Sequence, residues 1–279
     1  MAIYHLSLQN ISRRDGRNVV AAAAYRAGDR LRDERSGRVA NYRNKPHVAH
    51  TALLVPSEGS GWVRGREQLW NAVEMAERRS DARLAKEVNV ALPVELSKTD
   101  QIALAEAYGQ WFVARGLIVD VAVHHLESHN PHFHILMTTR EVTAEGFGKK
   151  HRWLDDKAFV VECRKAWTDI CNAWLGKGGR GERIDDRTLS AQGIERRPTV
   201  HRGVRAEQLA QRGIPPRSAV RTKRSFWGNE REIDYRQIDD GRSRADYNDS
   251  LRDDRAQLME RYRQMWDEER PDRDWERSR

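Results

Sequence analysis

The pattern of apolar and polar positions predicts a mixture of helices and strands over the first 176 residues. Apolar residues at helical spacing predict helices over residues 64–79, 97–116 and 155–176, and an alanine-rich run bounded by Asn18 and Gly28 predicts a further helix over 18–28. Alternating positions predict strands over residues 2–9, 87–93, 117–124 and 132–139. Residues 30–60 have weak periodicity and predict a loop or a short hairpin. We therefore expect the α+β class.

The strand over residues 117–124 has the clearest alternation. Val119, Val121 and Val123 fall on one face, whereas His124 falls on the other. A short polar segment separates this strand from the apolar run His132 to Thr139. The two runs therefore predict an antiparallel hairpin.

Half of the ten histidines fall within this hairpin, between residues 124 and 134. Residues two apart on a strand project from the same face, so His132 and His134 can reach one ion, and His124 on the facing strand can supply a third imidazole. The alternative is a polar hairpin tip with solvated rings. His125 and His129 fit that alternative better, but an unsatisfied imidazole within an apolar strand would be costly.

Three imidazoles with open positions suit a metal ion that acts as a Lewis acid, such as Mn²⁺ or Zn²⁺. A cupin-type site would require a glutamate three or four residues beyond His134, where the chain has methionine and threonine. The spacing favours a three-histidine centre and does not choose the ion.

The charge distribution favours a polyanionic partner. The chain has 50 Lys and Arg against 42 Asp and Glu, and residues 221–279 are nearly balanced, so the basic surplus belongs to residues 1–220. Neither a signal-peptide pattern nor an apolar run of about 18 residues occurs, so we expect a cytoplasmic protein without membrane insertion. Cys163 and Cys171 would lie about 12 Å apart on a helix and could not pair, which fits a reducing compartment.

The segment 124–134, with its Asn-Pro-His-x-His ending, closely resembles the metal motif of the MobA/MobL relaxases, the plasmid-mobilisation branch of the HUH endonucleases. Further stretches resemble the family in the same order: residues 2–6, 21–27, 87–93 and 183–201. The resemblance covers about residues 1–205.

The resemblance implies a relaxase fold, in which a mainly antiparallel sheet carries the histidine hairpin centrally under a cover of helices. It implies that Tyr25 is the nucleophile, that His124, His132 and His134 bind a divalent ion (Mn²⁺ or Mg²⁺, with Zn²⁺ left open), and that Glu87 is a nearby acidic group. Some relatives have a second carboxylate two residues after the glutamate, where this chain has Asn89, so the acidic contribution to the site is in question.

The implied chemistry is nicking and rejoining of one DNA strand at a plasmid origin of transfer through a 5′-phosphotyrosine. A phenol with an ordinary pKa of about 10 is only about a thousandth ionised at pH 7, so attack requires a base or a nearby positive charge. The alternatives are a rolling-circle replication initiator or a transposase of the same chemistry, or a non-catalytic DNA-binding partner.

Several side chains near these motifs are candidates for contact with single-stranded DNA: Arg26, Arg140, Arg152, Trp153, Arg183 and Arg187. We expect a nickase domain over residues 1–205 and a charged, largely helical extension over residues 206–279, with an amphipathic helix between Tyr247 and Met265. Accessory relaxosome proteins and the coupling protein of a type IV secretion system are the further partners that the resemblance implies.

Overall fold

The computed structural model describes residues 4–128, 130–177, 181–194, 197, 208–209, 211–214, 220–224, 230–234 and 246–251. The chain divides into two compact units, Met1–Asp186 and Arg187–Arg279. The domain boundary at residue 205 stays a prediction.

The first unit is built on a five-stranded sheet in the order β1, β5, β7, β6, β4, in which all neighbours run antiparallel. The strands are β1 (Leu6–Ser12), β4 (Val48–Leu54), β5 (Arg83–Ala91), β6 (Val119–His124) and β7 (His132–Met137). The predicted antiparallel hairpin is confirmed as β6 and β7, and β7 is the central strand.

The prediction for residues 30–60 is half right. A short hairpin does form, from β2 (Arg30–Arg32) and β3 (Val39–Asn41), but residues 48–54 are not a loop because they form the edge strand β4. Most residues of β4 are half-buried, and its register with β6 shifts between Val48 and His50. Such a strand lacks the clean alternation of buried and exposed positions that would have predicted it.

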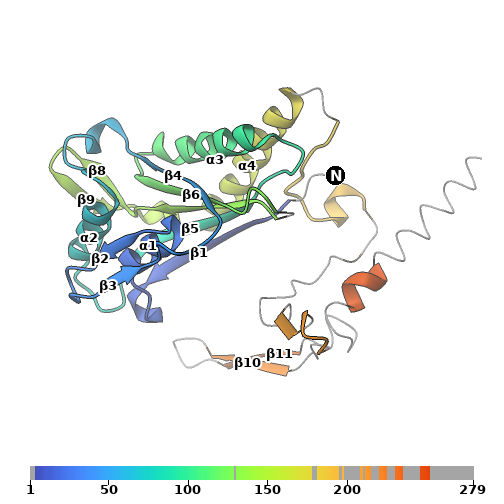
Figure 1. Cartoon of the computed structure of the whole chain (residues 1–279), viewed down its shortest axis with the longest axis horizontal. Helices are drawn as coiled ribbons and strands as arrows, with labels where there is room; N and C mark the ends of the chain where they lie inside the picture. The colour runs from blue at the N-terminus through green and yellow to red at the C-terminus, as the bar shows by residue number, and fades with distance from the viewer. Residues whose placement is uncertain are drawn as a thin grey trace, which may run out of the picture. The chain divides into compact units, whose positions relative to one another are not determined.

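Helices cover both faces of the sheet (Figure 1). The helices α3 (Lys98–Val113) and α4 (Lys157–Lys177) pack on the face formed by Val88, Val121 and Phe133. The helices α1 (Val19–Ala27) and α2 (Arg66–Ala76) cover the opposite face, where Leu84, Ala85 and Leu136 contribute to a second apolar cluster. This second face also carries the candidate functional site.

The predicted ends of α1 are confirmed. The side chain of Asn18 accepts a hydrogen bond from the Ala21 backbone N–H, and Gly28 ends the helix with φ of 63°. A Cβ at Gly28 would lie 3.0 Å from Cγ2 of Val48. Glycine is therefore required both by the backbone conformation and by the close approach of β4.

The remaining elements of the first unit are short. They are the 3₁₀ helices η1 (Arg13–Asp15), η2 (Ser57–Gly59) and η3 (Arg152–Asp155) and the hairpin of β8 (Arg140–Thr143) and β9 (Gly146–Lys150). Among the helices in the part of the chain that the structure describes, none has the length and apolar character needed to span a membrane.

The second unit contains η4 (Ser190–Gln192), a hairpin of β10 (Val220–Arg224) with β11 (Glu230–Asp234), and a helical segment over residues 246–251. The sequence did not predict this hairpin. The predicted amphipathic helix between Tyr247 and Met265 lies largely outside the described residues.

Candidate active site

Three histidines meet on the sheet face that α1 covers. His124 on β6 lies directly opposite His132 on β7, and His134 follows two residues later on the same face. One ring nitrogen from each histidine lies within 4.8 Å of those of the other two. A single metal ion could bind all three, as the spacing predicts.

Hydrogen bonds orient each imidazole of this cluster. Nε2 of His124 lies 2.6 Å from the carbonyl oxygen of Arg26, and Nδ1 of His132 lies 2.9 Å from that of Asn130. Nδ1 of His134 lies 3.0 Å from Oε1 of Glu87. Each partner is an acceptor only, so each ring donates through that nitrogen and keeps a lone pair on the other one. The donor set therefore fits a metal ion, since ligating histidines are commonly held in this way.

Burial keeps the rings in the form that binds metals. It lowers the pKa of His124 to about 3, against the opposing effect of the hydrogen bond to the Arg26 carbonyl oxygen. It also lowers the pKa of His132. Neutral imidazoles are the metal-binding species, so both rings are available at neutral pH.

Glu87 on β5 is the centre of a buried hydrogen-bond network. Its carboxylate accepts from Nε2 of Gln9 at 2.6 Å, from Nε of Arg26 at 2.6 Å and from His134. Burial raises the pKa of this carboxyl, but the hydrogen bonds from His134 and Arg26 and the charge of Arg26 outweigh burial and lower the pKa to about 2. Glu87 is therefore ionised and tied to His134.

Tyr25 lies at the end of α1, and half of its surface is exposed. The next residue, Arg26, connects it to the histidines twice: its carbonyl oxygen accepts from His124, and its guanidinium pairs with Glu87. The structure thus brings Tyr25, Glu87 and the three histidines into one region, although the sequence spreads them over more than 100 residues.

Lys45 was missed by the sequence analysis. Its Nζ lies 3.8 Å from the centre of the Tyr25 ring and donates to the Tyr25 carbonyl oxygen at 2.9 Å. Burial, aided by the charge of Arg26, lowers the pKa of Lys45 to about 8. A cation is therefore held against the candidate nucleophile. It lies in the segment with weak periodicity, and no motif there could have identified it.

Further imidazoles extend the cluster. The His125 ring stacks on His47, with ring centres 4.6 Å apart, and on His132, at 5.3 Å. Both His47 and His125 have positive φ, of 70° and 58°, and the His125 N–H donates to the His47 carbonyl oxygen at 2.9 Å. Rather than being freely solvated, His125 is half-buried and packs against a candidate ligand. His129 lies outside the described residues.

Asn89, where some relatives have a carboxylate, lies opposite His134 in the sheet. Within the described residues, its Oδ1 is buried without a hydrogen-bond partner.

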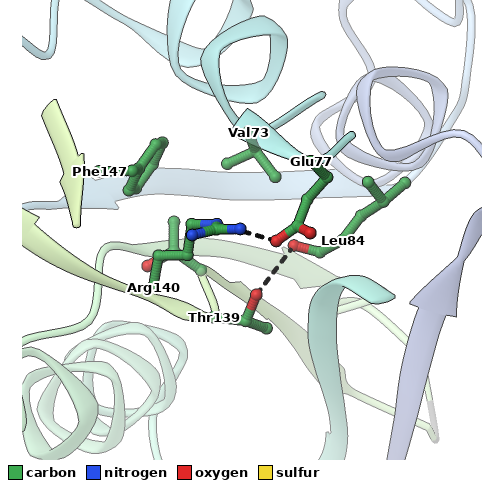
Figure 2. Close-up of a pocket in the computed structure, with 7 residues that line it drawn as sticks. Val73, Glu77, Leu84, Thr139, Arg140 and Phe147 are labelled. Atoms are coloured by element: carbon green, nitrogen blue, oxygen red, sulfur yellow. Dashed lines mark hydrogen bonds and ion pairs between the residues drawn. The ribbon is translucent and has the colours of Figure 1, made fainter. Parts of the chain in front are cut away.

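Arg26 and Arg140, which were predicted to contact DNA, are held in ion pairs. Arg26 pairs with Glu87, and Arg140 on β8 pairs with Glu77 at 2.9 Å. Figure 2 shows Arg140 directed at Glu77 inside a pocket lined by Phe147 and other apolar residues. Contact of these guanidinium groups with DNA stays a prediction.

Of the other four candidates, Trp153 lies on the sheet face opposite the histidine cluster. Trp153 packs on Phe159, with ring centres 5.1 Å apart, in the cluster on the α3 and α4 face, and Arg152 adjoins it as an exposed residue. Arg183 is exposed beside the segment that follows α4, and Arg187 belongs to the second unit.

Comparison with known proteins agrees with this arrangement. The family model described as "MobA/MobL family" matches residues 17–212. The chain is 35% identical over 256 residues to a probable conjugal transfer protein TraA of Sinorhizobium fredii, covering 80% of this chain and 23% of the relative. It is 36% identical over 251 residues to the mobilization protein MobL of Acidithiobacillus ferridurans, covering 76% of this chain and 65% of the relative.

A solved structure concerned with the molecular basis of vancomycin resistance transfer in Staphylococcus aureus is also similar. It is 28% identical, with a TM-score of 0.64, over 67% of this chain and 100% of that one. The chain spans less than two thirds of the length of the two curated relatives, TraA and MobL, and the similarity covers all of the solved chain. The family match includes α1 with Tyr25, Glu87 and the three histidines, and by this match the chain belongs to the MobA/MobL family.

Proposed function

We propose that the chain nicks and rejoins one strand of plasmid DNA at an origin of transfer. The main support is the pair of contacts made by Arg26, the residue after the exposed Tyr25. Its carbonyl oxygen accepts from His124, and its guanidinium binds Glu87, which in turn accepts from His134. The names of the relatives, conjugal transfer protein and mobilization protein, support DNA mobilisation as the setting.

In the proposed reaction the Tyr25 oxygen attacks the scissile phosphorus. The phenol loses its proton, the bond from phosphorus to the 3′ oxygen breaks, and that oxygen takes up a proton, which leaves a free 3′-hydroxyl and a 5′-phosphotyrosine. Attack by a 3′-hydroxyl in the reverse direction rejoins the strand and frees Tyr25. Because the covalent link conserves the phosphodiester energy, rejoining needs no ATP.

The residues of the chain have separate roles in this proposal. His124, His132 and His134 would hold a divalent ion, Mn²⁺ or Mg²⁺ in our prediction, which when bound neutralises charge on the phosphate. Glu87 positions His134 through the Nδ1 hydrogen bond, and Lys45 places positive charge beside the attacking ring. Accessory relaxosome proteins and a secretion coupling protein remain proposed partners.

The test is formation of a covalent adduct. The protein is incubated with a labelled oligonucleotide spanning a candidate origin of transfer, with Mn²⁺, with Mg²⁺ or with chelator, and the products are separated under denaturing conditions. Tyr25→Phe should abolish the adduct and preserve DNA binding, because it removes the nucleophilic oxygen and keeps the ring. Tyr42→Phe is the matched control, since Tyr42 is also exposed and its ring centre lies 5.2 Å from that of Tyr25.

Digestion with trypsin identifies the nucleophile, because Tyr25 falls in the peptide 18–26 and Tyr42 in the peptide 39–43. An adduct on peptide 39–43 would reassign the nucleophile. Wild-type protein that binds the oligonucleotide without any adduct would instead support the non-catalytic DNA-binding alternative.

A further inference from the structure

A cleft of about 600 Å³ lies between α1 and the β2–β3 hairpin. We call it the α1 cleft. It is lined by Asn18, which caps α1, by Ala21 of α1 and, from the hairpin segment, by Arg35, Arg38, Val39 and Tyr42. Its volume is within the range of about 300–1,000 Å³ that is typical of small-molecule sites.

The α1 cleft adjoins the candidate nucleophile. Ala21 and Tyr25 are four residues apart and therefore lie on the same side of α1, about 6 Å apart along the helix axis. Tyr42 connects the cleft to Tyr25, since it lines the cleft and its ring contacts the Tyr25 ring edge-on. A group bound beside Ala21 would thus be about one helical turn from the backbone of Tyr25.

Exposed apolar side chains gather at this cleft. Val39 and Tyr42, which line it, are 45% and 37% exposed, and Tyr25, whose ring contacts that of Tyr42, is 50% exposed. Exposed apolar groups that gather at a concave site commonly mark a binding surface. An aromatic ring and an aliphatic side chain form a surface on which a planar base can stack.

The rim of the cleft is cationic. Arg35 and Arg38 are exposed; Arg35 lies 3.7 Å from the carboxylate of Glu74, whereas the guanidinium of Arg38 has no ion-pair partner among the residues described. The one carboxylate in the lining, Asp33, is buried and already accepts from Asn18 at 2.8 Å and from Ser36. Stacking surfaces combined with arginines are the usual means of binding single-stranded nucleic acid.

The cleft is also preformed. Leu31 of the hairpin is buried in the apolar cluster beneath α1, and Asn71 of α2 accepts from the Glu34 N–H at 2.8 Å and donates to the Arg32 carbonyl oxygen at 2.8 Å. Glu67 of α2 accepts from the Arg32 N–H at 2.7 Å. These contacts hold the hairpin against α2, so binding would not require the walls to be ordered first.

From these observations we propose that the α1 cleft binds one nucleoside of the substrate strand, with its base against Tyr42 and Val39 and a flanking phosphate at Arg38. The proposal rests on the proposed function, because it places this nucleoside next to the scissile phosphate at Tyr25. It adds a subsite that binds a base. The histidines and the tyrosine account for cleavage but not for such a subsite.

Photocrosslinking tests the subsite without requiring cleavage. The full chain carrying Tyr25→Phe is irradiated with a twelve-residue oligothymidylate that contains 5-iodouracil, and the tryptic peptides are examined by mass spectrometry. We expect the crosslink on peptide 39–43, and its loss in Tyr42→Ala. Crosslinks confined to other peptides would overturn the proposal.

Binding of the same oligonucleotide, measured by fluorescence anisotropy, provides the second readout. Because loss of one stacking partner weakens binding by at least about fivefold, Tyr42→Ala should show that loss, whereas Tyr42→Phe should bind like the parent. Arg115→Ala is the control, since Arg115 is an exposed arginine that stacks on Trp111 of α3 over the other sheet face. Equal binding by Tyr42→Ala and the parent would refute the subsite.

The two proposals can fail separately. If wild-type protein forms no adduct but the crosslink falls on peptide 39–43, the nicking function is wrong and the binding site stands. If the adduct forms and Tyr42→Ala changes neither crosslink nor affinity, the nicking function stands and the subsite is wrong.

Discussion

Replacing Glu87 by alanine should damage both stability and metal binding, for two separable reasons. The side chains of Glu87 and Arg26 are 2% and 12% exposed. Removing one partner of so buried a pair leaves the other charge uncompensated, so the free energy of unfolding should fall by about 3–5 kcal/mol. The same change removes the acceptor for His134 Nδ1 and should weaken Mn²⁺ binding by about 10- to 100-fold.

Urea unfolding in the presence of chelator measures the first effect, and calorimetric titration of the folded protein with Mn²⁺ measures the second. Glu77→Ala is the matched control, because Glu77 holds Arg140 and Lys150, each at 2.9 Å, without any described contact to the histidine cluster. It should lower stability and leave Mn²⁺ affinity unchanged.

The double variant Arg26→Ala, Glu87→Ala separates the two effects further. It leaves no unpaired charge, so it should recover part of the stability lost in Glu87→Ala. His134 would still lack its acceptor, and Mn²⁺ affinity should stay low. Wild-type affinity in Glu87→Ala, or an equal loss of affinity in Glu77→Ala, would refute the assignment of Glu87 as the residue that positions His134.

Three further predictions concern other parts of the chain. Lys45→Met should slow adduct formation by about 3- to 30-fold. Because the pKa of Lys45 is lowered to about 8, the rate advantage of wild type over Lys45→Met should disappear as the pH rises through 8, whereas Lys45→Arg should keep that advantage. A ratio of the wild-type and Lys45→Met rates that does not change with pH would contradict the role of Lys45. Burial raises the pKa of Cys163 and of Cys171 to about 12, so neither thiol should react with Ellman's reagent at pH 8 until urea unfolds the protein, and rapid reaction of the folded chain would count against this core. Residues 1–205 should retain adduct formation, with DNA binding that falls with salt at a log–log slope of about −0.7 per contacted phosphate as in the full chain, and a flatter slope would show that the deleted segment contacts DNA.

The three-histidine cluster could be predicted from the sequence because its geometry is local. The two-residue period of a strand places His132 and His134 on one face, and a short hairpin places His124 opposite them. The ends of α1 could be predicted for the same reason, since Asn18 and Gly28 form hydrogen bonds with backbone groups only a few residues away. The choice of Tyr25, by contrast, came from family resemblance, as an alanine-rich helix gives no local reason to prefer one tyrosine.

What the sequence alone determined is thus the set of elements whose period or caps are encoded within a few residues, together with the histidines that those elements carry. The tertiary structure decided the contacts between segments that are distant along the chain: the Glu87 pair with Arg26, the position of Lys45 over Tyr25, the edge strand β4 and the α1 cleft. The physical reason is that these contacts depend on how α1, the hairpin and the sheet pack together. Packing is a property of whole surfaces in contact, and no residue spacing within a single segment specifies it.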